Sequence, residues 1–244
     1  MIKFFRKIRQ KLLTENKFSK YLIYAFGEIF LVVIGILIAL SINNWNIHNQ
    51  EREKELVLVK SMIEDIESDI AQSENVIAKL DLTVARIDSL LLELSTEHVF
   101  NNSNEAFRLF LRSSGFEDFT PNDRTIQILK NNGGFELISH KIAAEAIWEY
   151  DKHVKLFQGQ DDMMQMTLSN MSLFKFPFDI ISLRNPLKNK SPIPLLSNDK
   201  KELNYMYTNR VHWRIGINGI KFRINKVQNT GKETVRILKS TYGL

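Results

Sequence analysis

The chain has 244 residues, enough for one domain of ordinary size and a further segment. Hydrophobic residues make up 44% of it and charged residues 25%, which is typical of a folded protein and excludes a largely disordered one. Because there is no cysteine, disulfides, thiolate metal sites and cysteine nucleophiles are excluded. The pI of about 9.2 would suit a nucleic-acid-binding protein, so the location of the basic residues decides that question.

The excess of positive charge lies at the N-terminus. Residues 1–20 contain seven basic residues and one acidic residue, whereas residues 29–244 contain 26 of each. Basic residues that abut an apolar segment act as a topology signal, so we expect no nucleic-acid partner. Within this basic amphipathic segment, residues 1–13 have the pattern of a helix lying on an anionic inner leaflet, with a disordered basic tail as the alternative. The candidate membrane-surface residues are Lys3, Arg6, Lys7, Arg9 and Lys11.

Residues 21–42 form an apolar run with one charge and no proline. As a helix they would rise about 33 Å, enough to cross a hydrocarbon core of about 30 Å. The positive-inside rule then places the N-terminus in the cytoplasm and the rest of the chain across the membrane. A cleaved signal peptide is the competing interpretation, since Ala39-Leu40-Ser41 fits a cleavage site. The run is longer than the roughly 7–15 apolar residues of such peptides, which favours a retained transmembrane helix.

Glu28 is the single charged residue of the apolar run. If the helix enters the membrane at residue 21, the carboxylate lies about 10 Å inside the hydrocarbon. Gly27, Gly35 and Ala39 lie near the same face, and small residues permit close helix packing. We therefore interpret these four residues as a candidate transmembrane interface. The alternatives are a span that begins near Ile29, which leaves Glu28 among the headgroups, and a path for ions or protons.

The N-terminal region resembles a known family. Gly27-Glu28-Ile29 and Ile42-Asn43-Asn44-Trp45-Asn46 carry the resemblance, which is close over residues 4–46. It is looser at Ile128-Leu129-Lys130 and at Leu183-Arg184-Asn185-Pro186. The family is an uncharacterised one of single-pass membrane proteins in Bacteroidota, a domain of unknown function. The resemblance implies a bacterial inner-membrane location, hence a periplasmic C-terminal part, and supplies neither an activity nor functional residues.

Two regions have the spacing of long helices. From residue 51 to 95 apolar residues recur at alternating steps of three and four, without Pro or Gly, which predicts one helix of about 65 Å in a coiled coil or bundle. Residues 199–241 repeat this spacing. In the first region the expected core row is Leu56, Val59, Ile63, Ile66, Ile70, Ser73, Ile77, Leu80, Val84, Ile87, Leu91 and Leu94, widened on one side by Met62, Val76 and Leu90. In the second region it is Leu203, Met206, Arg210, Trp213, Ile217, Ile220, Ile224, Val227, Gly231, Thr234 and Leu238.

Charge predicts how the two helices pair. Residues 51–95 hold eleven acidic and five basic residues, whereas residues 199–241 hold three and ten. We predict an antiparallel hairpin that returns the C-terminus to the membrane surface, because opposite charges choose partner and direction. Its pairing residues are Glu67, Glu74, Asp81 and Asp88 on the first helix and Arg214 and Lys221 on the second. The alternative is that each helix pairs with its own copy in an oligomer.

Residues 99–198 are expected to form a small helical head. Thr120 has the features of an N-cap before Pro121, Gly133-Gly134 ends that helix, and Ser139 caps another that reaches about residue 173. The predicted fold is therefore all-α. Its segments are 1–20 (cytoplasmic), 21–42 (transmembrane), 43–98 (linker and long stalk helix), 99–198 (head with a Pro-containing loop) and 199–244 (return helix).

No motif in the sequence carries chemistry. The five histidines are scattered, and HExxH, GxSxG and GxGxxG are absent from the sequence. We expect no enzyme, no metal site and no cofactor. The leading hypothesis is a scaffold or protein-interaction module whose partner is the bilayer and either a second copy or another membrane protein. The alternatives are a sensor-like ligand-binding domain that signals through the stalk, and an accessory subunit of an ion-driven complex that uses Glu28.

Overall fold

The computed structural model describes residues 18–95, 103–131, 133–171 and 199–244. The regular elements of these residues are all helices, so the all-α prediction is confirmed. The chain divides into two compact units, Met1–Leu56 and Val57–Leu244. The five candidate membrane-surface residues and the Pro-containing loop lie outside the described residues.

Helix α2 (Phe18–Ser95) contains both the apolar run and the predicted stalk helix. A linker was expected after residue 42, but residues 43–50 continue the helix, because no Pro or Gly interrupts them. In the first unit the apolar side chains from Leu22 to Ile47 are mostly exposed. One 18-residue window has a mean hydropathy of 2.6 and none of it is buried. By length and composition this helix can cross a membrane.

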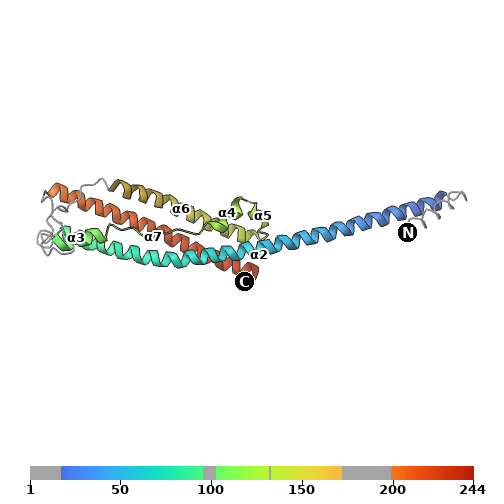
Figure 1. Cartoon of the computed structure of the whole chain (residues 1–244), viewed down its shortest axis with the longest axis horizontal. Coiled ribbons are helices and arrows are strands. Elements are labelled where there is room, and N and C mark those ends of the chain that lie inside the picture. Colours follow the sequence, from blue (N-terminus) through green and yellow to red (C-terminus); the bar gives the residue numbers. More distant parts are fainter. Residues whose placement is uncertain (1–17, 96–102, 132, 172–198) are drawn as a thin grey trace, which may run out of the picture. The chain divides into compact units, whose positions relative to one another are not determined.

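The second unit is built on three long helices that run side by side: α2 from residue 57, α6 (Lys141–Met171) and α7 (Lys200–Tyr242) (Figure 1). Helix α7 is antiparallel to α2, since Lys239 Nζ lies 2.7 Å from Glu67 Oε1 and Arg214 Nε lies 2.5 Å from Asp88 Oδ1. It is also antiparallel to α6, because Thr234 Oγ1 donates to the Ala146 carbonyl whereas Gly216 faces Met164.

Helix α7 has the boundaries and the buried face that its sequence predicts. The side chain of Asp199 accepts a hydrogen bond from the Lys201 N–H and caps the first turn. Gly243 ends the helix at a φ of 67°, a left-handed conformation that favours glycine. The buried residues are Met206, Arg210, Trp213, Ile217, Ile220, Ile224, Val227, Gly231, Thr234, Val235 and Leu238, so the predicted row is confirmed except at Leu203, which is partly buried.

The region expected as a head packs along the hairpin. Helix α6 is the third member of the bundle because Ala143, Ile147, Tyr150, Val154 and Phe157 form a continuous buried row. The shorter helices are α3 (Ser103–Arg112), α4 (Arg124–Asn131) and α5 (Gly134–Leu137). Between α3 and α4, residues 115–123 form an extended segment, here called the strap.

The strap runs back along α2. Lys79 Nζ of α2 lies 3.0 Å from Glu117 Oε2, and the Asn122 N–H lies 2.9 Å from Asp69 Oδ1, so residue numbers rise along the strap as they fall along α2. Phe119 of the strap packs edge-on against Phe157 of α6 with ring centroids 5.1 Å apart. The strap therefore connects α2 to α6 without any regular secondary structure of its own.

Glycines allow α7 to approach its neighbours closely. A Cβ atom at Gly231 would lie 3.0 Å from Ile66 Cγ2 of α2 and 3.2 Å from Tyr150 Cε2 of α6. At Gly219 a Cβ would clash with the Gln160 amide of α6. Small residues at these positions set how tightly the three helices pack.

We expect Gly231→Leu to lower the free energy of unfolding by about 3 kcal/mol, because the added side chain overpacks the contact with α2 and α6. Gly159→Leu is the matched control on α6, since no described atom lies within 4 Å of its Cβ position. There we expect a gain of up to about 1 kcal/mol from helix propensity. Thermal unfolding followed by circular dichroism measures both, and equal effects would contradict the close packing at Gly231.

Candidate functional site

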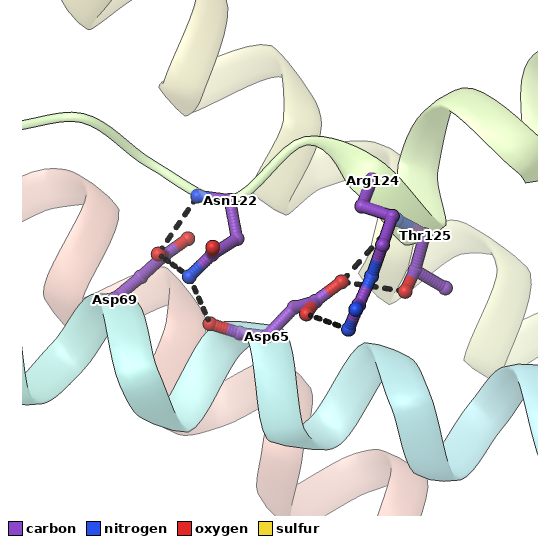
Figure 2. Close-up of polar contacts among 5 residues, drawn as sticks. All are labelled: Asp65, Asp69, Asn122, Arg124 and Thr125. Carbon is purple, nitrogen blue, oxygen red and sulfur yellow. Dashed lines mark hydrogen bonds and ion pairs between the residues drawn. The ribbon is translucent and has the colours of Figure 1, made fainter.

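Two carboxylates of α2 are buried where the strap crosses the helix. Asp65 is 6% exposed and Asp69 is 1% exposed, and they lie one helical turn apart on α2. Figure 2 shows both facing the end of the strap and the start of α4. A buried carboxylate is costly unless donors surround it, so the partners of these two groups define the site.

Asp69 is satisfied by the strap and by α6. Its Oδ1 accepts hydrogen bonds from the Asn122 N–H at 2.9 Å and from Asn122 Nδ2 at 2.8 Å. Its Oδ2 accepts from the hydroxyl of Tyr150 at 2.6 Å. Both oxygens therefore have donors, and one buried side chain holds together α2, the strap and α6.

Asp65 caps helix α4 from outside that helix. Its Oδ2 accepts from the Thr125 N–H at 3.2 Å and from Thr125 Oγ1 at 2.5 Å, while Arg124 Nη2 lies 3.0 Å from Oδ1. An N-cap normally supplies such an oxygen from the residue before the helix. Here α2 supplies it to the Thr125 N–H in the first turn of α4 (Figure 2).

The predicted start of this helix was therefore wrong. Thr120 was expected as the N-cap, but α4 begins at Arg124, and an early helical bond runs from the Gln127 N–H to the Asp123 carbonyl at 2.8 Å. Residues 120–123 belong instead to the strap, because Asn122 is held in place by Asp69.

Burial sets the proton affinities of this cluster. Burial raises the pKa of the Asp69 carboxyl above its usual 3.8, hydrogen bonds from Tyr150 and Asn122 partly offset this, and the nearby Asp65 charge adds to it. Burial and the Asp69 charge also raise the pKa of the Tyr150 hydroxyl. The phenol therefore keeps its proton and acts as a hydrogen-bond donor. With every carboxylate oxygen bonded, the arrangement suits a structural clasp, a name we use for Asp65, Asp69, Asn122, Arg124, Thr125 and Tyr150.

Two other charged side chains are buried in the bundle. Asp151 of α6 lies 2.5 Å from Lys130 Nζ of α4 and 3.0 Å from Lys155 Nζ, so it is doubly paired. Arg210 of α7 is 5% exposed and its guanidinium lies 3.8 Å from the centre of the Phe110 ring. Burial lowers the pKa of Arg210 to about 10. Within the described residues, its Nη1 atom has no hydrogen-bond partner.

The acidic flank of α2 meets four basic residues of α7. Asp88 pairs with Arg214, Asp81 with Lys221, Glu74 with Lys232 and Glu67 with Lys239. The structure thus brings together the acidic residues and the two basic residues that the sequence singled out, and it adds Lys232 and Lys239. Most of these side chains are about half exposed, so each pair contributes little to stability and the set mainly favours the antiparallel direction.

The residues of the candidate transmembrane interface lie on the exposed part of α2. Glu28, Gly35 and Ala39 share one side of the helix, whereas Gly27 lies about 100° away from Glu28. Among the described residues, no atom lies within 4 Å of the Cβ position of Gly27 or Gly35. Around Gly35 the described residues therefore leave space for a neighbouring helix.

The expected core row of α2 is buried at Val59, Ile63, Ile66, Ser73, Leu80 and Ile87. Sequence reasoning nevertheless missed the clasp, because Asp65 and Asp69 lie outside that row. The residues Met62, Asp69, Val76, Thr83 and Leu90 are buried, whereas Ile70, Ile77, Val84 and Leu91 are only partly buried. Two polar residues in a row of Met, Val and Leu at heptad spacing were the available signal. The described residues also contain no group of three or more His, Asp or Glu arranged to hold a metal ion.

One protein-family model matches just over half of the chain. Residues 28–155 match a family of unknown function, DUF6090. The chain belongs to this family. The DUF6090 match extends from Glu28 to the middle of α6, so it includes all six clasp residues, while α7 lies beyond it. No curated protein and no solved structure matches the chain.

In this DUF6090 chain we expect Asp69→Ala to lower the free energy of unfolding by about 2–4 kcal/mol, because it leaves buried donors of Asn122 and Tyr150 without an acceptor. Glu64→Ala is the matched control, since Glu64 is an exposed acidic residue of the same helix. We expect it to change stability by less than about 0.5 kcal/mol. Thermal unfolding of the full chain in mild detergent measures both; similar losses would show that the clasp does not stabilise the fold.

The raised pKa of Asp69 also predicts a pH dependence. The folded chain binds this proton more tightly than the unfolded chain, so the contribution to stability is present at low pH and is lost as the pH rises through the folded pKa. Asp69→Asn cannot ionise and lacks this loss. We therefore expect the variant to gain stability relative to the natural chain as the pH rises above the unfolded pKa of about 3.9, measured by urea unfolding. A difference that does not change with pH would contradict this prediction.

Proposed function

We propose that the chain is a non-catalytic interaction module, anchored by the N-terminal part of α2 in the inner membrane of a bacterium. Residues 57–244 would then lie in the periplasm. The observation that carries the proposal is the exposed apolar segment of α2, whose mean hydropathy over 18 residues is 2.6 with no part buried. Such a surface requires an apolar environment, and a bilayer supplies one over the necessary length.

Two further features support an interaction role. The buried carboxylates of Asp65 and Asp69 have donors on all four oxygens, so neither is poised to act as a base. No described atom lies within 4 Å of the Cβ position of Gly35, and Ala39 lies one turn further along the same side of α2, so small residues there permit close approach of a second helix. We propose that this side contributes to association within the membrane. The resemblance of residues 4–46 to membrane proteins of Bacteroidota supports the same location.

The orientation can be tested by labelling, because the natural chain has no cysteine. In intact bacterial cells, we expect Ser240→Cys on α7 to react with a membrane-impermeant maleimide. Ser19→Cys, which precedes the apolar run, should react only after permeabilisation. Resistance of the chain to carbonate extraction tests the anchor itself. Labelling of Ser19→Cys alone in intact cells would reverse the topology, and release by carbonate would overturn membrane anchoring.

A further inference from the structure

The outward face of α2 in the second unit carries no charge between residues 68 and 92. Its positions follow alternating steps of three and four, which is the spacing of a helix–helix seam. They are Ser68, Ala71, Asn75, Ala78, Leu82, Ala85, Ser89 and Leu92, and all are exposed. Leu82 is 57% and Leu92 66% exposed. A helix face that only meets water normally carries Lys and Glu, so this pattern indicates a partner. We call these eight residues the outer seam.

The outer seam lies on the side of α2 opposite its own bundle. The row through Ile66, Ser73, Leu80 and Ile87 is buried against the rest of the second unit, and helical geometry places it roughly opposite the seam. The alanines permit close approach of a second helix, while the leucines supply apolar contact area. Asn75 places one amide within the seam, a feature that fixes register and favours two strands in parallel helical pairs.

The charges beside the outer seam identify the partner. One flank consists of Glu67, Glu74, Asp81 and Asp88, and the other of Gln72, Lys79, Arg86 and Glu93. When two copies lie parallel and in register, each acidic residue faces the residue five positions later in the other copy. Glu74 then faces Lys79, and Asp81 faces Arg86. Glu67 faces Gln72, which is neutral, and Asp88 faces Glu93, which is the one unfavourable contact of the four.

An antiparallel pair would set the acidic flank of one copy against the acidic flank of the other, which is unfavourable. The contacts within each chain leave the flanks accessible, since the side chains of Glu74, Asp81 and Lys79 are 61%, 56% and 50% exposed. A parallel arrangement also follows from a shared membrane anchor, because both α2 helices then leave the bilayer at the same end.

We infer that two copies of this chain pair in parallel along the outer seam, with Asn75 of one copy opposite Asn75 of the other. The direction of pairing rests on the proposed membrane anchoring. The pairing itself rests on the uncharged seam and its complementary flanks.

Single cysteines in the full chain test this pairing, because no natural cysteine competes. In a parallel pair the same seam residue of both copies comes within disulfide distance. We expect Ala78→Cys and Ser89→Cys to give disulfide-linked dimers on mild oxidation in native membranes. Asn229→Cys, on an exposed part of α7, is the control and should give at least tenfold less dimer. Equal yields at all three positions, or dimers absent at both seam positions, would overturn the proposal.

A second variant separates pairing from folding. Ala78→Glu puts a charge into the seam but alters an exposed residue, so the helical content and the thermal midpoint should match those of the natural chain. Combined with Ser89→Cys, it should reduce the dimer at least tenfold, whereas Asn229→Glu should not. An unchanged dimer yield would overturn pairing along the seam. If the seam variants fail while the chain still resists carbonate extraction, the anchor stands and only this pairing is wrong.

Discussion

The burial of Asp69 is the constraint on which the second unit depends. A carboxylate in the middle of an apolar helix row must find donors, and Asp69 finds them on two other parts of the chain. The strap supplies a backbone N–H and an amide, and α6 supplies a phenol. The donors of the strap and α6 must therefore lie beside the same turn of α2. That requirement fixes the position of α6 along the axis of α2 and the path of the strap. Apolar contacts alone would tolerate other placements, because they have no direction.

Helix α7 contributes in a different way. It joins α2 through exposed ion pairs and joins α6 through close contacts at glycines. The ion pairs are individually weak, but together they distinguish the antiparallel arrangement from the parallel one. Three kinds of contact therefore define the bundle. Asp69 fixes the position of α6 along α2, the charge pattern fixes the antiparallel direction of α7, and small residues set the distance between the helices.

The sequence predicts the parts of this fold that depend on periodicity and local chemistry. The long helices follow from apolar spacing, the start of α7 from Asp199, and the antiparallel direction from opposite charge on the two helices. It fails where a distant residue replaces a local one. Thr120 and Pro121 have the local features of a helix start, yet Asp65 supplies the capping oxygen from 60 residues away. The burial of Asp69 beside the expected core row of α2 was missed because this residue is polar, and its burial depends on donors of the strap and α6 that no local pattern contains. The role of α6 as a third helix of the bundle was missed as well, because an apolar row on a helix does not identify the surface against which it packs.

The spacing of the ion pairs between α2 and α7 has a consequence for how the hairpin can move. Along α2 the paired acids are separated by three steps of seven residues, whereas along α7 their partners follow steps of seven, eleven and seven. Between the first two pairs and the last two, α7 therefore advances about one helical turn further than α2. If α7 slid along α2 by one turn, all four pairs would separate by about 5 Å, and no base would reach another acid, because the acids recur only every seven residues, nearly two turns. The four pairs therefore oppose a slide of one turn in either direction.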